Sequence, residues 1–172
     1  MKKLIKLLCI LIISIGVTSC RKESLITNVT ILDKIDLEKI EMDTSILRNH
    51  FPRVKFQPIK VDLLNNTNSN LQYWTESCSW QSNWIPDHKS ITWFVECPKN
   101  IPILVTIAPH ETKSYYGIVE SNDSIVVAGS DFRIGFVLVR KNEVHEEGDF
   151  IHILRYKIET KKDIYWSNSI IP

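Results

Sequence analysis

Glycine is scarce in this 172-residue sequence, which contains only five glycines. Four of them follow the first twenty residues: Gly117, Gly129, Gly135 and Gly148. None lies in a G-x-G-x-x-G or G-x-x-x-x-G-K pattern, the arrangements whose backbone N–H groups hold phosphate. The sequence therefore gives no support for nucleotide binding.

An excess of charge of either sign is also missing. Lys and Arg number 21 and Asp and Glu number 20, so the formal net charge is +1. Proteins that bind nucleic acid through its phosphates usually carry a clearly basic surface. We therefore expect no nucleic-acid partner.

The apolar run at residues 7–17 is too short to cross a membrane, because a transmembrane helix needs about 20 apolar residues. Three lysines precede this run, and three small residues follow it. A basic start, a short apolar stretch and a small-residue end are typical of a secretion signal. We therefore expect the protein to be exported.

The end of this signal, Val17-Thr18-Ser19-Cys20, resembles the lipobox of bacterial lipoproteins. The resemblance implies that residues 1–19 are removed as a signal peptide and that Cys20 carries a diacylglyceryl group, with acyl chains such as palmitate. We expect a lipid anchor in the bacterial cell envelope. In enteric lipoproteins an Asp directly after the lipidated cysteine favours retention at the inner membrane; this chain has Arg21 there, so the resemblance implies the outer membrane. An ordinary cleaved signal with a free Cys20 is the alternative.

The chain changes character near residue 54. Residues 20–53 are predicted to form the lipidated N-terminus and a charged linker with a short helix, because charged residues dominate there. From Val54 onward apolar and polar residues alternate, with one phase slip at Pro58 that suits a bulge or an edge position. Residues 54–172 are predicted to be one domain.

This domain is predicted to be mostly β, a single antiparallel immunoglobulin-like β-sandwich of about eight short strands. The expected strands are 54–63, 71–80, 90–97, 103–107, 115–119, 125–128, 132–139 and 150–158. In the last two, alternating residues are expected to line single faces: Phe132, Ile134, Phe136 and Leu138, then Phe150, His152, Leu154 and Tyr156. His152 is therefore interpreted as a core residue.

Two cysteines lie in the predicted domain, Cys78 and Cys97, and export places both in an oxidising compartment. If residues 85–89 form the turn of a hairpin, its register puts the two cysteines opposite each other, so we predict a disulfide. The same register places Trp80, Trp84 and Trp93 on one face. A reactive or metal-binding thiol pair is the weaker alternative, because no C-x-x-C motif is present.

Several short segments between residues 60 and 120 look like small immunoglobulin-like envelope modules of bacteria, among them the intracellular proteinase-inhibitor (BsuPI-type) domain. The segments are Asn66-Thr67-Asn68, Asp87-His88-Lys89, Trp93, and Pro109-His110-Glu111 running into Tyr115. The resemblance implies a sandwich with a binding or inhibitory role, and it transfers no inhibitory residue. Such modules have Pro-Gly-Glu where this chain has Pro109-His110-Glu111, so we expect the turn at these residues to differ from the turn of the modules.

Candidate sites are few. His145-Glu146-Glu147 with Asp149 is the densest group of metal-ligand types, and we interpret it as a solvated hairpin turn around Gly148. No G-x-S-x-G motif or other catalytic constellation occurs, so we expect no enzyme activity, no metal and no cofactor. For Trp74, Trp80, Trp84 and Trp93, core packing is favoured over a binding surface, and Trp84 is the candidate for exposure.

These inferences predict a membrane-anchored envelope lipoprotein that acts as a non-catalytic binding or interaction module. Its expected partners are the lipid bilayer, through the acyl chains, and an envelope protein or glycan. The alternatives are an exported hydrolase, a protease-inhibitor-like domain, or a structural subunit of an envelope assembly.

Overall fold

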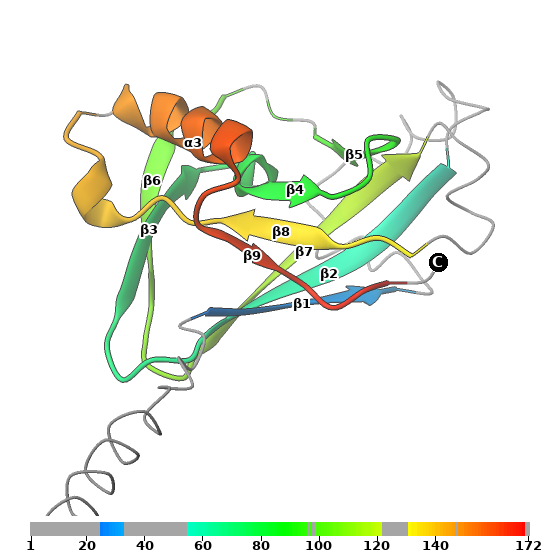
Figure 1. Ribbon diagram of the computed structural model, residues 1–172, viewed down its shortest axis with the longest axis horizontal. Helices are drawn as coiled ribbons and strands as arrows, with labels where there is room; N and C mark the ends of the chain where they lie inside the picture. The colour runs from blue at the N-terminus through cyan, green and yellow to red at the C-terminus, as the bar shows by residue number, and fades with distance from the viewer. Residues whose placement is uncertain are drawn as a thin grey trace, which may run out of the picture.

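The computed structural model describes residues 25–32, 55–95, 97, 99–121, 131–146 and 148–170. These residues form nine β-strands, one α-helix and two short 3-10 helices (Figure 1). Every strand pairing among them is antiparallel, so the protein is mostly β, as predicted. Cys20, the predicted short helix of the linker and the predicted strand 125–128 lie outside the described residues. In the described part of the chain, no helix is both long and apolar enough to cross a bilayer.

The largest sheet contains four strands in the order β1-β2-β7-β5. Their bounds are Leu25–Ile31 for β1, Lys55–Asn65 for β2, Thr112–Ser121 for β7 and Ile91–Phe94 for β5. Strand β1 lies within the predicted linker, so that prediction was wrong for these residues. Leu25, Thr27 and Val29 alternate as buried residues on one face, which gives this short stretch the period of a half-buried strand.

Pro58 lies in β2 just beyond the end of β1. The backbone N–H of Leu32 donates to the Pro58 carbonyl at 3.0 Å, but proline has no N–H to return a bond to Leu32. The side-chain amide of Gln57 donates to the Leu32 carbonyl instead, at 3.3 Å. Pro58 therefore lies where β2 loses β1 on one side, while on the other side it still pairs with Ile118 of β7, so the predicted edge position holds for one side only.

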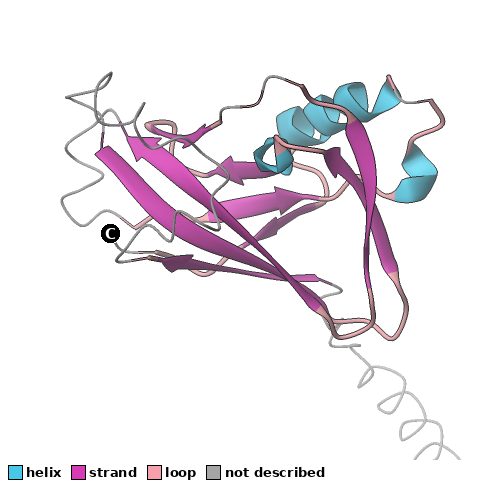
Figure 2. Cartoon of the chain, turned by 180° about the vertical axis from the view of Figure 1, so that it is seen from behind, coloured by secondary structure: helices cyan, strands magenta, loops and turns pink. Residues whose placement is uncertain are grey.

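A second sheet has the order β4-β8-β9, with bounds Trp84–Pro86, Ile134–Val137 and Ile164–Trp166. Strands β3 (Leu71–Glu76) and β6 (Pro102–Ile107) form a separate pair. The backbone N–H of Trp74 donates to the Val139 carbonyl at 2.9 Å, which joins this pair to the end of β8. Figure 2 shows the same strands from behind, with the helix on one side of them.

The main core lies between the two larger sheets, which gives a sandwich-like arrangement; the immunoglobulin-like topology stays a prediction. Residues of β1, β2, β5 and β7 meet residues of β4 and β8 there. The alternating residues of the predicted strand 132–139 all belong to this core, as expected: Phe132, Ile134, Phe136 and Leu138. Val137 and Val139 point the other way, into a second apolar cluster under the helix. Strand β8 is therefore buried on both faces.

The stretch predicted as the final strand is instead helix α3 (Asp149–Thr160), and that prediction was wrong. Phe150, Leu154 and Lys157 are its buried residues, and their spacing of four and three is that of one helix face. His152 and Tyr156 are exposed, so His152 is not a core residue. Phe150 and Leu154 fit both the alternation of a strand and the spacing of one helix face. The alternation of apolar residues therefore did not distinguish the helix from a strand.

Residues 77–101 do not form the predicted hairpin. Strand β4 pairs with β8 and strand β5 pairs with β7, so the two belong to different sheets. Helix η1 (Trp80–Asn83) occupies the place of the expected first arm. The side-chain amide of Asn83, which is fully buried, donates to the carbonyls of Trp74 and Val137 at 3.0 Å each. These long-range bonds hold the segment in a conformation that local alternation did not indicate.

Candidate functional site

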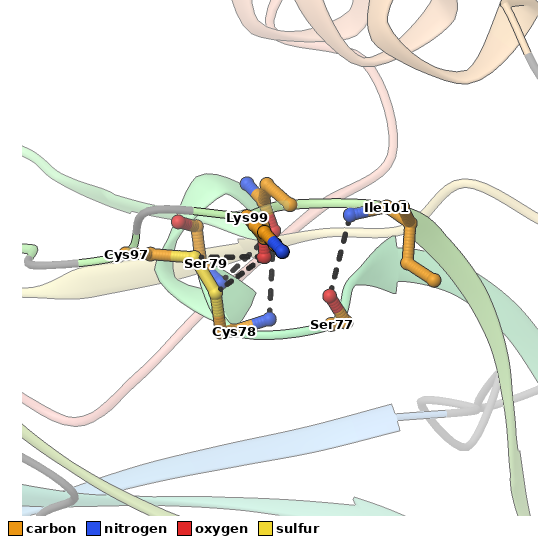
Figure 3. Close-up of a disulfide and its surroundings, with 7 residues drawn as sticks. Ser77, Cys78, Ser79, Cys97, Lys99 and Ile101 are labelled. Carbon is orange, nitrogen blue, oxygen red and sulfur yellow. Dashed lines mark hydrogen bonds between the residues drawn. A yellow bond between two sulfur atoms is a disulfide. The ribbon is translucent and has the colours of Figure 1, made fainter.

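A disulfide joins Cys78 to Cys97, whose Cα atoms are 5.9 Å apart (Figure 3). The predicted pairing is therefore present, although the hairpin that suggested it is not. The bond lies at the base of the 77–101 segment, where the Ser77 N–H donates to the Ile101 carbonyl at 2.9 Å. Closing a loop of about 20 residues stabilises a fold by about 3 kcal/mol on the chain-entropy model. Because this segment supplies one strand to each larger sheet, the disulfide restrains both.

The tryptophans for which core packing was favoured over a binding surface mainly contribute to the core. Trp84, the candidate for exposure, is only 2% exposed, so that prediction was wrong. Trp80 stacks on Tyr115 with the ring centroids 4.8 Å apart, and the indole N–H of Trp93 donates to the Trp84 carbonyl at 2.7 Å. Trp74 packs against the second cluster, under α3. The favoured interpretation of these residues, core packing, fits their contacts.

Gly117 allows this close aromatic packing. A Cβ atom at this position would lie 3.0 Å from Cζ3 of Trp93 and 3.1 Å from Cζ2 of Trp80. Such distances are tighter than ordinary van der Waals contact, so a larger side chain would push both rings away. The strand therefore needs a glycine at the point where the two indoles cross it.

A pair of tyrosine hydroxyls lies within the same core. The hydroxyl groups of Tyr73 and Tyr115 hydrogen-bond to each other. Burial raises the pKa of Tyr73 far above its ordinary value, and the neighbouring Tyr115 raises it further. Burial also raises the pKa of Tyr115 to about 12, against a smaller lowering by the hydrogen bond to Tyr73. Both hydroxyl groups therefore stay protonated at neutral pH, and each provides the hydrogen-bond partner of the other.

In the acidic cluster, Asp149 at the start of α3 bonds back to the segment that precedes the helix. Its predicted hairpin turn around Gly148 is absent, because the segment leads directly into α3. A carboxylate oxygen of Asp149 accepts the backbone N–H groups of His145 and Glu146, at 3.2 and 3.1 Å. Glu147 lies outside the described residues. Within the described ranges, no three His, Cys, Asp or Glu side chains gather as a metal site would require.

Lys157 is a buried charge that the sequence did not single out. Its ammonium group donates to Glu143 at 2.7 Å, to Asp163 at 2.9 Å and to the Leu138 carbonyl at 2.7 Å. Glu143 belongs to helix η3 (Lys141–Glu143), and Asp163 precedes β9. These bonds fasten α3 to the end of β8. Recognising the helical spacing of Phe150 and Lys157 would have placed this lysine on the buried face.

A surface hollow of about 360 Å³ lies beside the C-terminal end of α3, lined in part by Trp166, Arg133 and Lys161. The Arg133 guanidinium lies 5.2 Å from the centre of the Trp166 ring. Its Nε donates to Asp87 at 3.0 Å, while the Arg133 side chain remains 49% exposed. A Cβ at Gly135 would lie 2.8 Å from the Trp166 ring, so this glycine lets the indole lie close to β8.

Sequence reasoning missed this hollow because its residues come from four separate segments. One signal was available: Trp166 is the single tryptophan outside the group at residues 74–93. Neither the predicted disulfide nor the predicted tryptophan group at residues 74–93 therefore explained the presence of Trp166. An aromatic ring under an exposed guanidinium is an arrangement suited to binding a partner.

No family model matches the sequence, and no curated protein matches it either. Among solved structures, the chain is similar to one described as the crystal structure of FixG-related protein from Vibrio parahaemolyticus. The TM-score is 0.38 and the sequence identity 7%, over 87% of this chain and 96% of that chain. A similarity at this level carries no conclusion about function.

Proposed function

We propose that this protein is a lipid-anchored binding module of the bacterial envelope, attached through Cys20, with no catalytic turnover. The anchoring part rests on the basic start, the short apolar run and Val17-Thr18-Ser19-Cys20. The binding part rests on the hollow where Arg133 lies over Trp166. The partner is an envelope protein or glycan.

The chemistry of the hollow favours a partner that carries an acidic group. Tryptophan and arginine supply much of the binding energy at known interfaces, because they combine a large apolar area with hydrogen-bond donors. The ion pair with Asp87 holds Arg133 in place before a partner arrives, which lowers the entropic cost of binding. Lys161, which is exposed, adds a second positive charge at the rim.

Crosslinking in intact cells tests the binding proposal. We expect Lys161→Glu and Arg133→Ala each to lose the crosslinked partner that the parent protein captures. Tyr156→Ala removes an aromatic side chain that is 57% exposed on α3 but does not line the hollow, so it should keep the partner. Capture that is unchanged in both hollow variants, or lost in the Tyr156 variant, contradicts the proposal.

Membrane fractionation tests the anchoring proposal separately. A Cys20→Ala variant should leave the membrane fraction, because one acyl chain or none gives only marginal attachment. Retention of this variant in the membrane at the level of the parent protein would show that lipid on Cys20 is not the anchor.

A further inference from the structure

We propose that the anchored protein rests on the bilayer by one defined end, formed by the turns at residues 66–70 and 108–111. The lipid headgroups are the partner of this surface. The inference builds on the proposed lipid attachment at Cys20. It is carried by the position of β1, which begins at Leu25, with only four residues between it and that cysteine.

The short distance along the chain limits where the folded body can lie. Five Cα-to-Cα steps join Cys20 to Leu25, and they span at most about 18 Å in any conformation. A linker reaching to residue 54, as the sequence suggested, could instead span up to about 120 Å. The strand therefore has to begin close to the membrane surface.

Both turns meet the beginning of β1 at one corner of the molecule (Figures 1 and 2). Leu25 pairs with Asn65, the last residue of β2. The Asn65 N–H donates to the Glu111 carbonyl at 3.0 Å, and its own carbonyl accepts the His110 N–H at 2.9 Å. The fully buried Asn65 side-chain amide donates to the carbonyls of Ser69, Ile107 and Ala108 at 2.8, 3.1 and 3.0 Å. Asn65 therefore ties the start of β1 and both turns into one unit.

The two turns also contact each other directly. A ring nitrogen of His110 hydrogen-bonds to the Asn68 side chain at 2.9 Å. His110 has a φ of 60°, a left-handed conformation that favours glycine. The contact gives the corner a fixed shape.

The surface of this corner suits headgroups rather than hydrocarbon. Its exposed residues are mostly polar: Asn68, Ser69, Asn70, Ala108, Pro109, His110 and Glu111. Among the described residues, the large exposed hydrophobic side chains are Val95, Ile101, Ile151 and Tyr156. None of these belongs to either turn, so the corner is expected to touch the headgroup layer without inserting into the acyl chains.

This orientation places the Asp87 and Arg133 side of the candidate binding hollow away from the bilayer. Strand β7 runs from Thr112 beside the corner to Ser121, a distance of about 30 Å at 3.4 Å per residue. Ser121 pairs with Ile91, next to the turn that contains Asp87 and Lys89. The N–H of Asp87 donates to the Arg133 carbonyl at 3.0 Å, which places this side of the hollow near the far end.

Quenching by spin-labelled lipid tests the orientation in the full-length lipidated protein. The protein is reconstituted in phosphatidylethanolamine and phosphatidylglycerol vesicles that contain a lipid with a nitroxide headgroup. A fluorophore is attached through Ser69→Cys at the corner or through Lys89→Cys at the far end, both exposed positions. We expect the label at position 69 to lose most of its fluorescence and the label at position 89 to lose little.

A longer tether provides the matched control. Ten Gly and Ser residues inserted between Ser24 and Leu25 add at most about 36 Å of reach. This insertion should weaken quenching at position 69 while the protein still floats with the vesicles. If the protein does not float or carries no lipid, the proposed anchoring fails. If it floats and both labels are quenched equally, or position 89 more strongly, the orientation is wrong and the anchoring stands.

Discussion

The two faces of the β4-β8-β9 sheet are covered in different ways. Its inner face packs on the four-stranded sheet through aliphatic and aromatic residues, with the Tyr73–Tyr115 hydroxyl pair among them. Its outer face is covered by α3, through a smaller apolar cluster and the buried Lys157. Separating the inner face from the four-stranded sheet opens the whole sandwich, whereas uncovering the outer face requires only that α3 move away. We therefore expect α3 to open locally at a lower free-energy cost than the core.

Replacing one buried phenylalanine on each face by alanine is expected to give the largest difference in unfolding free energy between the two faces. Phe136 and Phe150 are both fully buried, on the inner and outer face respectively. We expect Phe136→Ala to cost about 5 kcal/mol and Phe150→Ala about 3 kcal/mol of unfolding free energy. The Phe136 ring is held between Tyr73 and Trp84, at 5.1 and 4.9 Å between centroids, whereas α3 can shift to fill part of the cavity.

Urea unfolding of both variants measures these costs. Equal losses, or a larger loss for Phe150→Ala, would show that the helix is as firmly held as the sandwich, and the distinction between the two faces would then fail.

The same two faces show what sequence patterns can and cannot predict. Alternation correctly placed Phe132, Ile134, Phe136 and Leu138 in one core, because in a strand the side-chain period alone decides the face. It failed for α3, where a lysine occupies the buried stripe and only its distant partners, Glu143 and Asp163, explain it. A charged residue at a core position makes a helical face look interrupted.

Pairings between distant segments were also beyond the sequence. Strand β1 alternates, but its buried Thr27 is explained only by a hydrogen bond to the Tyr165 carbonyl at 3.0 Å. The disulfide was predicted from a hairpin that does not form, since β4 and β5 pair with β8 and β7. The hollow at Trp166 could not be predicted, because sequence does not show that Arg133 and Asp87 meet there.

Removing the buried charge of Lys157 tests the outer face by itself. Lys157→Met should cost about 2 kcal/mol, the loss of charge-assisted hydrogen bonds. The cost stays moderate because the side chains of Glu143 and Asp163 remain 30% and 28% exposed, so water can solvate them. Lys162→Met, at an exposed neighbour, is the control and should change stability by less than about 0.5 kcal/mol.

Amide hydrogen exchange decides where the Lys157 effect lies. We expect faster exchange in α3 and little change in β2 and β7. An equal acceleration in all three elements would mean that α3 unfolds only together with the sandwich.

The tyrosine pair gives the smallest expected effect at neutral pH. Replacing both hydroxyls, with Tyr73→Phe and Tyr115→Phe together, should change the unfolding free energy by less than about 1 kcal/mol at pH 7, since neither hydroxyl is left unpaired. Each single variant should cost more, about 1–3 kcal/mol, because one buried hydroxyl then has no partner.

At alkaline pH the pair should matter more. Burial raises the pKa of Tyr115 to about 12, so the folded protein keeps a proton that the unfolded chain releases above about pH 10. The unfolded state then binds fewer protons, and stability falls as the pH rises from about 10 towards 12. Urea unfolding across this range should show a smaller alkaline loss in the double variant than in the parent. Identical pH profiles would contradict the assignment.

The central claim is that a lipid on Cys20 holds this β-rich body at a membrane. Mass spectrometry of the N-terminal peptide of the protein purified from its native membrane tests that claim most directly. We predict a chain that begins at Cys20 and carries a diacylglyceryl group. A peptide in which Cys20 is unmodified, whether or not residues 1–19 have been removed, would contradict it.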